Sequence, residues 1–285
     1  MFFYLLYKVG IFLALACPLR LVYAIATAAA YVKYAVSRTE RLEIYENLRQ
    51  VLPLESTKTL KLYARRIFVN FSKYLVDFFR FDKIDAEYIK DRVEVVNRDC
   101  IDGALKRGKG AIVLSAHLGN WELGGVIVGL LGHPLNVIAL DHANKRINEF
   151  FIRQRSSKGE KVIPVNVALR RCFSALANNE ILGILGDKDY ANHGVLVKFF
   201  GRDTVLPKGP AVFSLKTGAS IVPGFMIRTP EDNFQFIFDK PIEYRATGNF
   251  EEDVIALTER CGLIIEGYIR RYPTQWYCFR RFWQG

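Results

Sequence analysis

The cysteines of this 285-residue sequence form no pattern that would hold a metal or a disulfide framework. There are five of them, none in a Cys-x-x-Cys pair and none beside histidines at zinc-ligand spacing. An odd, scattered set in a chain of this length indicates reduced thiols that are buried in the core of a cytosolic domain. We therefore expect no metal and no other cofactor.

Several motifs of other enzyme and binding classes are also missing. The sequence has no Gly-x4-Gly-Lys-Ser/Thr phosphate loop, and Ser115 is not surrounded by the Gly-x-Ser-x-Gly turn of serine hydrolases. Internal repeats and low-complexity segments are absent. Runs of Lys and Arg interleaved with aromatic residues do not occur outside the N-terminal segment, which argues against nucleic acid as a partner.

What the sequence does have is apolar residues and positive charge. Hydrophobic residues make up 51% of the chain, and 40 Lys and Arg against 29 Asp and Glu leave a net charge of +11. The mean hydropathy is slightly positive, at +0.08. A basic surface favours anionic partners, which include phospholipid headgroups, an acidic carrier protein and nucleic acid.

The N-terminal segment resembles a membrane anchor. Up to residue 34 its only charged side chains are basic, and residues 9–32 are apolar except for Arg20 and Thr27, with Pro18 in the middle. At about 1.5 Å per residue such a stretch is long enough to cross a bilayer. We expect a membrane anchor over residues 1–36 and a catalytic domain over residues 37–285. The helix would either span the bilayer or lie in one leaflet, and the alternative is a helix packed on the domain.

The rest of the sequence alternates between short apolar runs and amphipathic stretches, which is typical of an α/β fold. The expected strands are residues 93–96, 111–115, 135–140, 161–165, 181–185, 220–227 and 234–238. The expected helices are residues 38–50, 56–80, 99–106, 121–131, 145–158, 168–178, 209–217 and 251–271. We expect a layered, mostly parallel β-sheet flanked by helices.

The segment with the strongest chemical signal follows the strand at residues 111–115. His117 stands at the strand end, and Glu122 comes five residues later, near a helix start. A histidine can take a proton at neutral pH, and a carboxylate on its other ring nitrogen fixes the tautomer. Between them, Gly119 and Asn120 would offer free main-chain N–H groups to a carboxylate or an oxyanion. The alternative is a histidine that caps the strand end beside a solvated glutamate.

These residues belong to a set of motifs that resembles a known family. The run His117-Leu-Gly-Asn-Trp-Glu122 looks like the His-x4-Asp/Glu motif of the bacterial lipid A late acyltransferases, of lauroyl/myristoyl type, in the lysophospholipid acyltransferase superfamily. The other similar segments are residues 153–158 (RQRSSK), 187–190 (DKDY), 197–201 (VKFFG), 217–223 (TGASIVP), 272–276 (YPTQW) and 280–283 (RRFW). Lys188 stands where the family has glutamine.

The resemblance implies a glycerol-3-phosphate acyltransferase-like fold and roles for several residues. His117 would be the general base and Glu122 its partner, with no acyl-enzyme intermediate. Arg155 would bind a phosphate or stabilise the oxyanion, since a guanidinium offers fixed donors, and Arg153 would do so less directly. Asp187, at the end of a strand, would be a further site residue. The alternatives are surface arginines on a basic helix for Arg153 and Arg155, and a turn or helix cap for Asp187.

The resemblance also implies the partners and the location. The donor would be an acyl carrier protein and the acceptor a hydroxyl of a lipid A precursor or a related glycolipid, at the inner (cytoplasmic) membrane with the catalytic domain facing the cytoplasm. A second hypothesis keeps the chemistry but has a lysophospholipid or another glycolipid as acceptor, and acyl-CoA or acyl carrier protein as donor. A third is a non-catalytic basic protein that binds anionic membranes.

Overall fold

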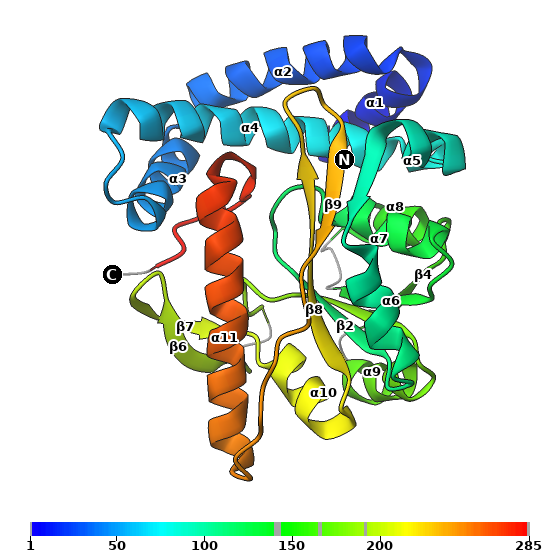
Figure 1. Ribbon diagram of the computed structural model, residues 1–285. Coiled ribbons are helices and arrows are strands. Elements are labelled where there is room, and N and C mark those ends of the chain that lie inside the picture. Colours follow the sequence, from blue (N-terminus) through cyan, green and yellow to red (C-terminus); the bar gives the residue numbers. More distant parts are fainter. Residues whose placement is uncertain (1, 140–143, 165–166, 191–192, 284–285) are drawn as a thin grey trace.

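The fold is an α/β arrangement in which helices flank a mostly parallel sheet (Figure 1). The computed structural model describes residues 2–139, 144–164, 167–190 and 193–283, with side chains from residue 7 onward. The helices are α1 (Phe2–Ala16), α2 (Leu19–Val36), α3 (Arg38–Val51), α4 (Thr57–Phe79), α5 (Ala86–Arg92), α6 (Arg98–Lys106), α7 (Trp121–Leu130), α8 (Lys145–Ser156), α9 (Ala168–Ala177), α10 (Gly209–Thr217) and α11 (Phe250–Arg271).

Seven strands form the main sheet, in the order β1-β9-β8-β2-β5-β3-β4. They are β1 (Val93–Val96), β2 (Ala111–Ser115), β3 (Leu135–Ala139), β4 (Glu160–Pro164), β5 (Ile181–Leu185), β8 (Ser220–Arg228) and β9 (Phe234–Phe238). Neighbouring strands are parallel except β8 and β9, which form an antiparallel pair. The sheet confirms the expected α/β class, and each of its strands lies where the sequence pattern indicated.

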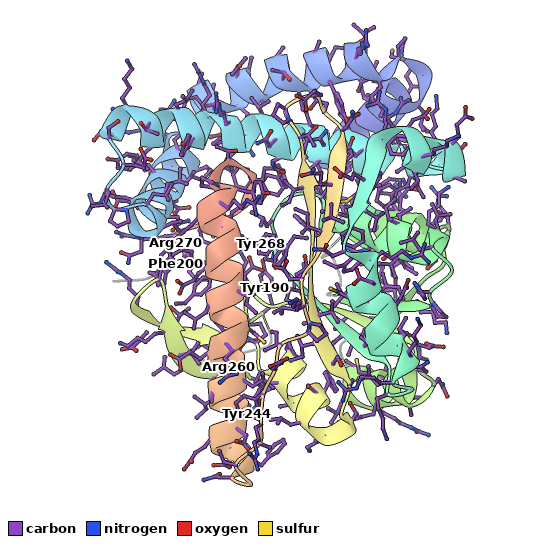
Figure 2. The ribbon with its side chains drawn as sticks, in the orientation of Figure 1. Tyr190, Phe200, Tyr244, Arg260, Tyr268 and Arg270 are labelled. Atoms are coloured by element: carbon purple, nitrogen blue, oxygen red, sulfur yellow. The ribbon has the colours of Figure 1, made fainter. Side chains whose placement is uncertain are left out.

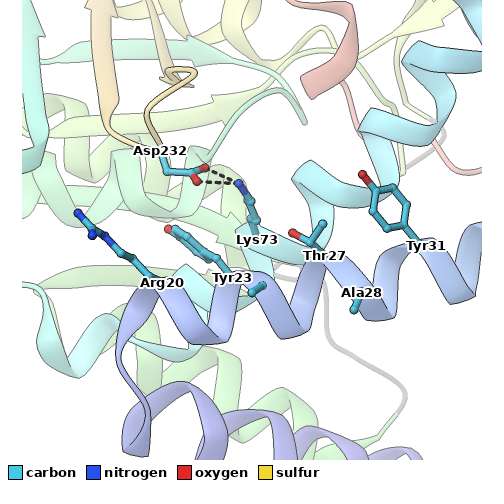
Figure 3. A pocket seen from close by; sticks show the side chains of 8 residues that line it. Arg20, Tyr23, Thr27, Ala28, Tyr31, Lys73 and Asp232 are labelled. Carbon is cyan, nitrogen blue, oxygen red and sulfur yellow. Dashed lines mark hydrogen bonds and ion pairs between the residues drawn. The ribbon is translucent and has the colours of Figure 1, made fainter.

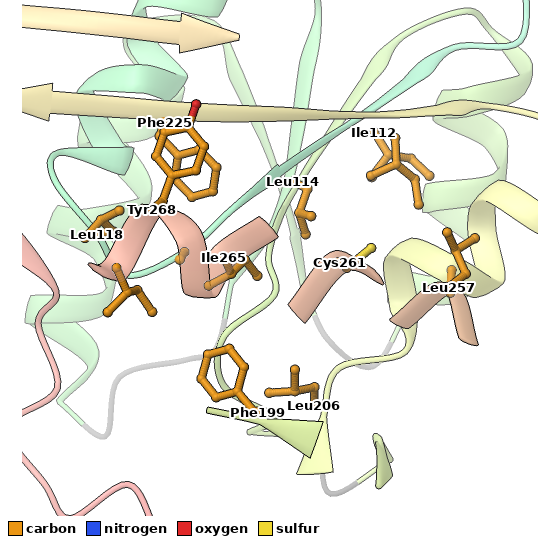
Figure 4. Packing of buried hydrophobic residues seen from close by; sticks show 14 of the residues in the cluster. Ile112, Leu114, Leu118, Phe199, Leu206, Phe225, Leu257, Cys261, Ile265 and Tyr268 are labelled. Carbon is orange, nitrogen blue, oxygen red and sulfur yellow. The ribbon is translucent and has the colours of Figure 1, made fainter. Parts of the chain in front are cut away.

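The central strand β2 is buried on both faces, which explains why its sequence is a continuous apolar run. Successive side chains point to opposite faces. Ile112 and Leu114 pack in the cluster that includes α9, α10 and α11, with Phe225 and Tyr268 stacked nearby (Figure 4). Ala111 and Val113 pack in the opposite cluster, toward α6, α7 and α8.

A small antiparallel hairpin was not expected from the sequence. It consists of β6 (Val195–Phe199) and β7 (Arg202–Leu206), and it lies against α11. The main-chain N–H of Phe200 donates to Glu266 at 2.5 Å, and the guanidinium of Arg270 lies 4.6 Å from the Phe200 ring centroid (Figure 2). The turn is tight, because Phe200 and Gly201 both have positive φ.

The apolar N-terminal segment forms two helices instead of one continuous helix over residues 9–32. The chain breaks at Cys17 and Pro18, since proline lacks the N–H that a helix interior needs. By length and composition, one described helix, α2, is long and apolar enough to cross a membrane. In the structure α2 lies beside α4 (Figure 1), and only 17% of it is buried.

Candidate functional site

His117 and Asp187 meet at the carboxyl ends of two neighbouring parallel strands. Ser115 of β2 is in register with Leu185 of β5. His117 and Asp187 each lie two residues after these paired positions, with one residue between. His117 Nδ1 consequently lies 2.8 Å from Asp187 Oδ1. The geometry places a carboxylate on one ring nitrogen of the histidine.

Asp187 is fully buried, yet it is surrounded by hydrogen-bond donors. Its Oδ1 also accepts the main-chain N–H of His117 at 3.1 Å, and its Oδ2 accepts the indole N–H of Trp276 at 3.0 Å. Burial alone would raise the pKa of Asp187, but the charges and hydrogen bonds of His117, Lys188 and Trp276 outweigh burial and lower it below the usual value. Asp187 is therefore ionised at neutral pH.

An ionised carboxylate only accepts hydrogen bonds, which determines the tautomer of the neutral histidine. Nδ1 of His117 carries the proton and donates it to Asp187, and Nε2 is left with a lone pair. The histidine side chain is 20% exposed. Its ring lies between Trp121 and Tyr190, with centroids 5.2 and 5.8 Å away (Tyr190 is labelled in Figure 2). The arrangement suits a base that takes a proton on Nε2.

Glu122 does not occupy the place beside His117 that we expected for it. It lies in the first turn of α7, is 5% exposed, and receives two hydrogen bonds from Arg155 of α8, at 2.9 Å from Nε and 2.5 Å from Nη2. Glu122 faces α8, whereas Asp187 comes from the strand next to His117. The structure thus corrects the expected contact: Asp187 holds the histidine, and Glu122 holds Arg155.

The pair of Glu122 and Arg155 keeps its charges despite burial. Burial alone would lower the pKa of Arg155, but the charge and hydrogen bonds of Glu122 raise it above its usual value. Two of the guanidinium's five donors are used in this pair, and among the described residues Nη1 has no hydrogen-bond acceptor, so it could bind another partner. Arg153, two residues earlier, is exposed on α8 and does not contact Glu122.

Gly119 and Asn120 do not offer free N–H groups at the helix start. The Gly119 N–H donates to the Gln275 carbonyl at 2.9 Å, and the Asn120 N–H donates to the Met226 carbonyl at 2.7 Å. Gly119 has φ of +66°, and a Cβ there would come within 2.0 Å of the Met226 oxygen. These two residues therefore shape the loop after His117, and the expectation that they bind an oxyanion is wrong for their main-chain donors.

The Asn120 side chain connects the loop to a buried ion pair that sequence reasoning missed. It caps α7 by accepting the Leu123 N–H at 3.1 Å and donates to Asp77 at 2.9 Å. Asp77 is paired with Arg228 and accepts a hydrogen bond from Tyr23 of α2. The sequence signal for this ion pair was the carboxylate of Asp77 within the apolar stripe of α4. A charge buried there without a partner would destabilise the fold.

The C-terminal segment holds the other side of the loop. The Tyr277 N–H donates to the His117 carbonyl at 2.8 Å, and Leu118 bridges Trp276. Lys188 donates to the Tyr277 carbonyl at 2.9 Å. Motifs that lie far apart in the sequence, at residues 115–122, 187–190 and 272–277, thus form one site.

A second buried carboxylate near Glu122 was also missed. Glu160, at the start of β4, is 4% exposed, and its Oε1 has no hydrogen-bond partner among the described residues. Burial and the charge of Glu122 raise its pKa well above the usual value. Over the described ranges, no group of three or more His, Cys, Asp and Glu side chains is placed to hold a metal ion.

Comparison with known proteins gives a consistent result over the whole length. The model of one protein family, described as bacterial lipid A biosynthesis acyltransferase, matches residues 1–285. A phosphatidylinositol mannoside acyltransferase of Mycolicibacterium smegmatis is 25% identical over 289 aligned residues, which cover 97% of this chain and 90% of that protein.

Two further relatives match over shorter regions. The phosphatidylinositol mannoside acyltransferase of Mycobacterium tuberculosis strain H37Rv is 25% identical, with 75% of this chain and 68% of that protein covered. The lipid A biosynthesis palmitoleoyltransferase of Escherichia coli K12 is 28% identical, with 66% and 61% covered.

Proposed function

The chain belongs to the family of bacterial lipid A biosynthesis acyltransferases, and from this premise we propose that it is a membrane-bound O-acyltransferase with His117 as its general base. Membership of the family makes it an acyltransferase that acts on a lipid. The observation that carries the mechanism is the 2.8 Å contact between His117 Nδ1 and the buried Asp187 carboxylate. It leaves Nε2 as the atom that accepts a proton.

In the proposed reaction, an acceptor hydroxyl gives its proton to His117 Nε2 while its oxygen attacks the carbonyl carbon of an acyl thioester. The tetrahedral intermediate collapses as the carbon–sulfur bond breaks, and the leaving thiolate takes the proton back from the imidazolium. Products are an ester and a free thiol. Asp187 stabilises the imidazolium and keeps the ring oriented, so no acyl-enzyme is required.

We propose that Glu122 acts by positioning Arg155. The two hydrogen bonds between them fix the plane of the guanidinium. The remaining Nη1 donors would contact a phosphate or the oxyanion of the intermediate. This assignment keeps both residues in the site but separates Glu122 from the histidine.

Charge and the names of the relatives support our proposal for the substrates. An acyl carrier protein is acidic, and a chain with a net charge of +11 would attract it. The relatives are named for lipid A and for phosphatidylinositol mannoside, which supports a glycolipid acceptor, with a lipid A precursor as our first candidate. An acceptor of the mannoside type is the second candidate, because that relative aligns with 97% of this chain. The apolar, largely exposed α2 supports association with a membrane, and we propose the inner membrane, with the site facing the cytoplasm.

The test is His117→Ala in the purified full-length protein. We expect loss of thiol release from acyl carrier protein thioesters in the presence of acceptor lipid, with unchanged circular dichroism and thermal midpoint. Acyl-CoA in a parallel reaction identifies the donor, and mass spectrometry of lipids from cells with and without the protein identifies the acceptor. Activity of the variant within tenfold of the wild type would refute the base, and binding without thiol release in the wild type would leave the non-catalytic alternative.

A further inference from the structure

A pocket of about 540 Å³ lies between the N-terminal helix α1 and α8, outside the contacts described for His117. Its apolar side chains include Tyr7 and Ile11 of α1 and Phe150 of α8. A pocket of this volume fits a small headgroup rather than a whole lipid. The size and lining therefore indicate a site for part of an amphiphilic molecule.

The polar lining of this pocket is mainly cationic. Lys8, Arg146 and Arg153 contribute three positive charges, against one negative charge from Glu149. These side chains come from two helices that are far apart in the sequence. Guanidinium groups bind phosphate oxygens with paired donors, so the excess charge favours a phosphate group as the ligand.

The pocket is next to the apolar surface that would enter the membrane. Val9 and Phe12 of α1 are exposed, by 49% and 68%, and Leu21 and Val32 of α2 by 51% and 65%. A lipid whose tails lay along these side chains would present its headgroup at the level of Lys8. Aromatic and basic residues are typical of that boundary.

The pocket is also close to the pair of Glu122 and Arg155. The ring of Tyr7 lies 6.5 Å from that of Phe151, and the Arg155 guanidinium lies 5.7 Å from the Phe151 ring on the same helix. Arg155 in turn binds Glu122. One aromatic side chain therefore separates the pocket from the pair of Glu122 and Arg155.

We propose that this pocket binds the phosphate-bearing headgroup of the acceptor lipid and presents its free hydroxyl to His117. That the bound lipid is the acceptor rests on the proposed function, but the binding of a lipid phosphate can be tested on its own. Arg146 and Arg153 would contact the phosphate, while Tyr7 and Ile11 would cover the first carbons of the tails.

A second pocket, of about 450 Å³, lies along α2 and offers a comparison outside the proposed site (Figure 3). It contains Arg20 and Lys73, but Lys73 already forms an ion pair with Asp232 through two hydrogen bonds, of 2.7 and 2.8 Å. Arg20 is a basic, exposed side chain at the start of α2 and lies outside the proposed site. Arg20→Ala changes the net charge as Arg153→Ala does.

The experiment measures binding of phosphatidylinositol to the full-length protein in micelles of a neutral detergent, with diacylglycerol as the phosphate-free probe. We expect Arg153→Ala and Arg146→Ala each to weaken phosphatidylinositol binding about tenfold, and Arg20→Ala to change it less than twofold. Diacylglycerol binding should be weak and equal in all four proteins. In turnover assays the two pocket variants should raise the KM for the acceptor and leave kcat unchanged.

Unchanged phosphatidylinositol binding in Arg153→Ala and Arg146→Ala would overturn the proposal. An equal loss in Arg20→Ala would overturn it too, because it would show general attraction to an anionic surface. If the pocket variants lose binding while the wild type releases no thiol from any thioester, the pocket stands as a lipid-phosphate site and the proposed function fails. The lipid-phosphate site and the acyltransferase function are therefore refuted by different measurements.

Discussion

Replacing Asp187 by asparagine tests which carboxylate acts with His117, Asp187 or Glu122. The carboxylate accepts three N–H groups: two from His117, at 2.8 and 3.1 Å, and one from Trp276, at 3.0 Å. An asparagine has a single acceptor oxygen, so its NH2 group must face one of these donors. One buried N–H is then left without an acceptor, at a cost of about 1–3 kcal/mol in the free energy of unfolding.

The effect of Asp187→Asn on the reaction should be larger than its effect on stability. If the NH2 group faces His117, Nδ1 becomes an acceptor, and the ring proton moves to Nε2, which can no longer take a proton. If the oxygen faces His117 instead, the imidazolium loses its counter-charge. We expect kcat to fall by about 10³–10⁴-fold, measured as thiol release from an acyl thioester at saturating acceptor.

Glu122→Gln is the matched control for this prediction. It removes a negative charge from a buried pair and leaves Arg155 with a weaker acceptor, so unfolding should become easier by up to about 3–5 kcal/mol. The fall in kcat should be smaller than for Asp187→Asn, with a rise in the acceptor KM. If Asp187→Asn keeps kcat within tenfold of the wild type while a folded Glu122→Gln loses 10³-fold, the reasoning from geometry is refuted.

Stability against pH provides an independent check on Asp187. Its pKa is lowered in the folded protein, so its ionised form stabilises the fold above the unfolded pKa of about 3.9, and this contribution is lost as the pH falls further. The difference in unfolding free energy between the wild type and Asp187→Asn should therefore shrink as the pH falls below about 4. A difference that did not change with acidity would show that the carboxylate is not stabilised in its ionised form.

Two further changes test the buried charges around the site. Asp77→Ala removes the close partner of the buried Arg228 and leaves only the longer contact to Asp232, at 3.5 Å, so the free energy of unfolding in urea should fall by up to about 3–5 kcal/mol. Tyr23→Phe removes one hydroxyl from the same network and should cost only about 1 kcal/mol. Equal losses would show that the ion pair of Asp77 and Arg228 is not the main contributor. Glu160 has a raised pKa, so the wild type loses stability as the pH rises above about 4.3, by up to about 1.4 kcal/mol per pH unit. Glu160→Gln should therefore gain stability relative to the wild type as the pH rises above about 4.3, measured by thermal unfolding at several pH values. A margin that does not change with pH would contradict the raised pKa.

Most of the sheet was predictable because hydrophobic pattern is a local property. The run at residues 111–114 is apolar at every position, and a strand buried on both faces has that pattern. The hairpin of β6 and β7 was missed because its strands lie outside the main sheet and because β7 is exposed or half-buried at every position before Leu206. The break at Pro18 was visible as an interruption, but that the two halves form separate helices depends on their contacts with α4.

The sequence by itself determined that His117 follows a strand, that a carboxylate is available to it, and that the N-terminal segment is apolar and basic. Tertiary structure alone decided which carboxylate it is. Glu122 is closer along the chain, but a helix start directs it toward Arg155 of α8, whereas parallel pairing of β2 with β5 brings the distant Asp187 to the histidine. The spacing of residues along a chain determines local periodicity. Contacts between strands depend instead on the order of the strands in the sheet, and no single segment of the sequence specifies that order.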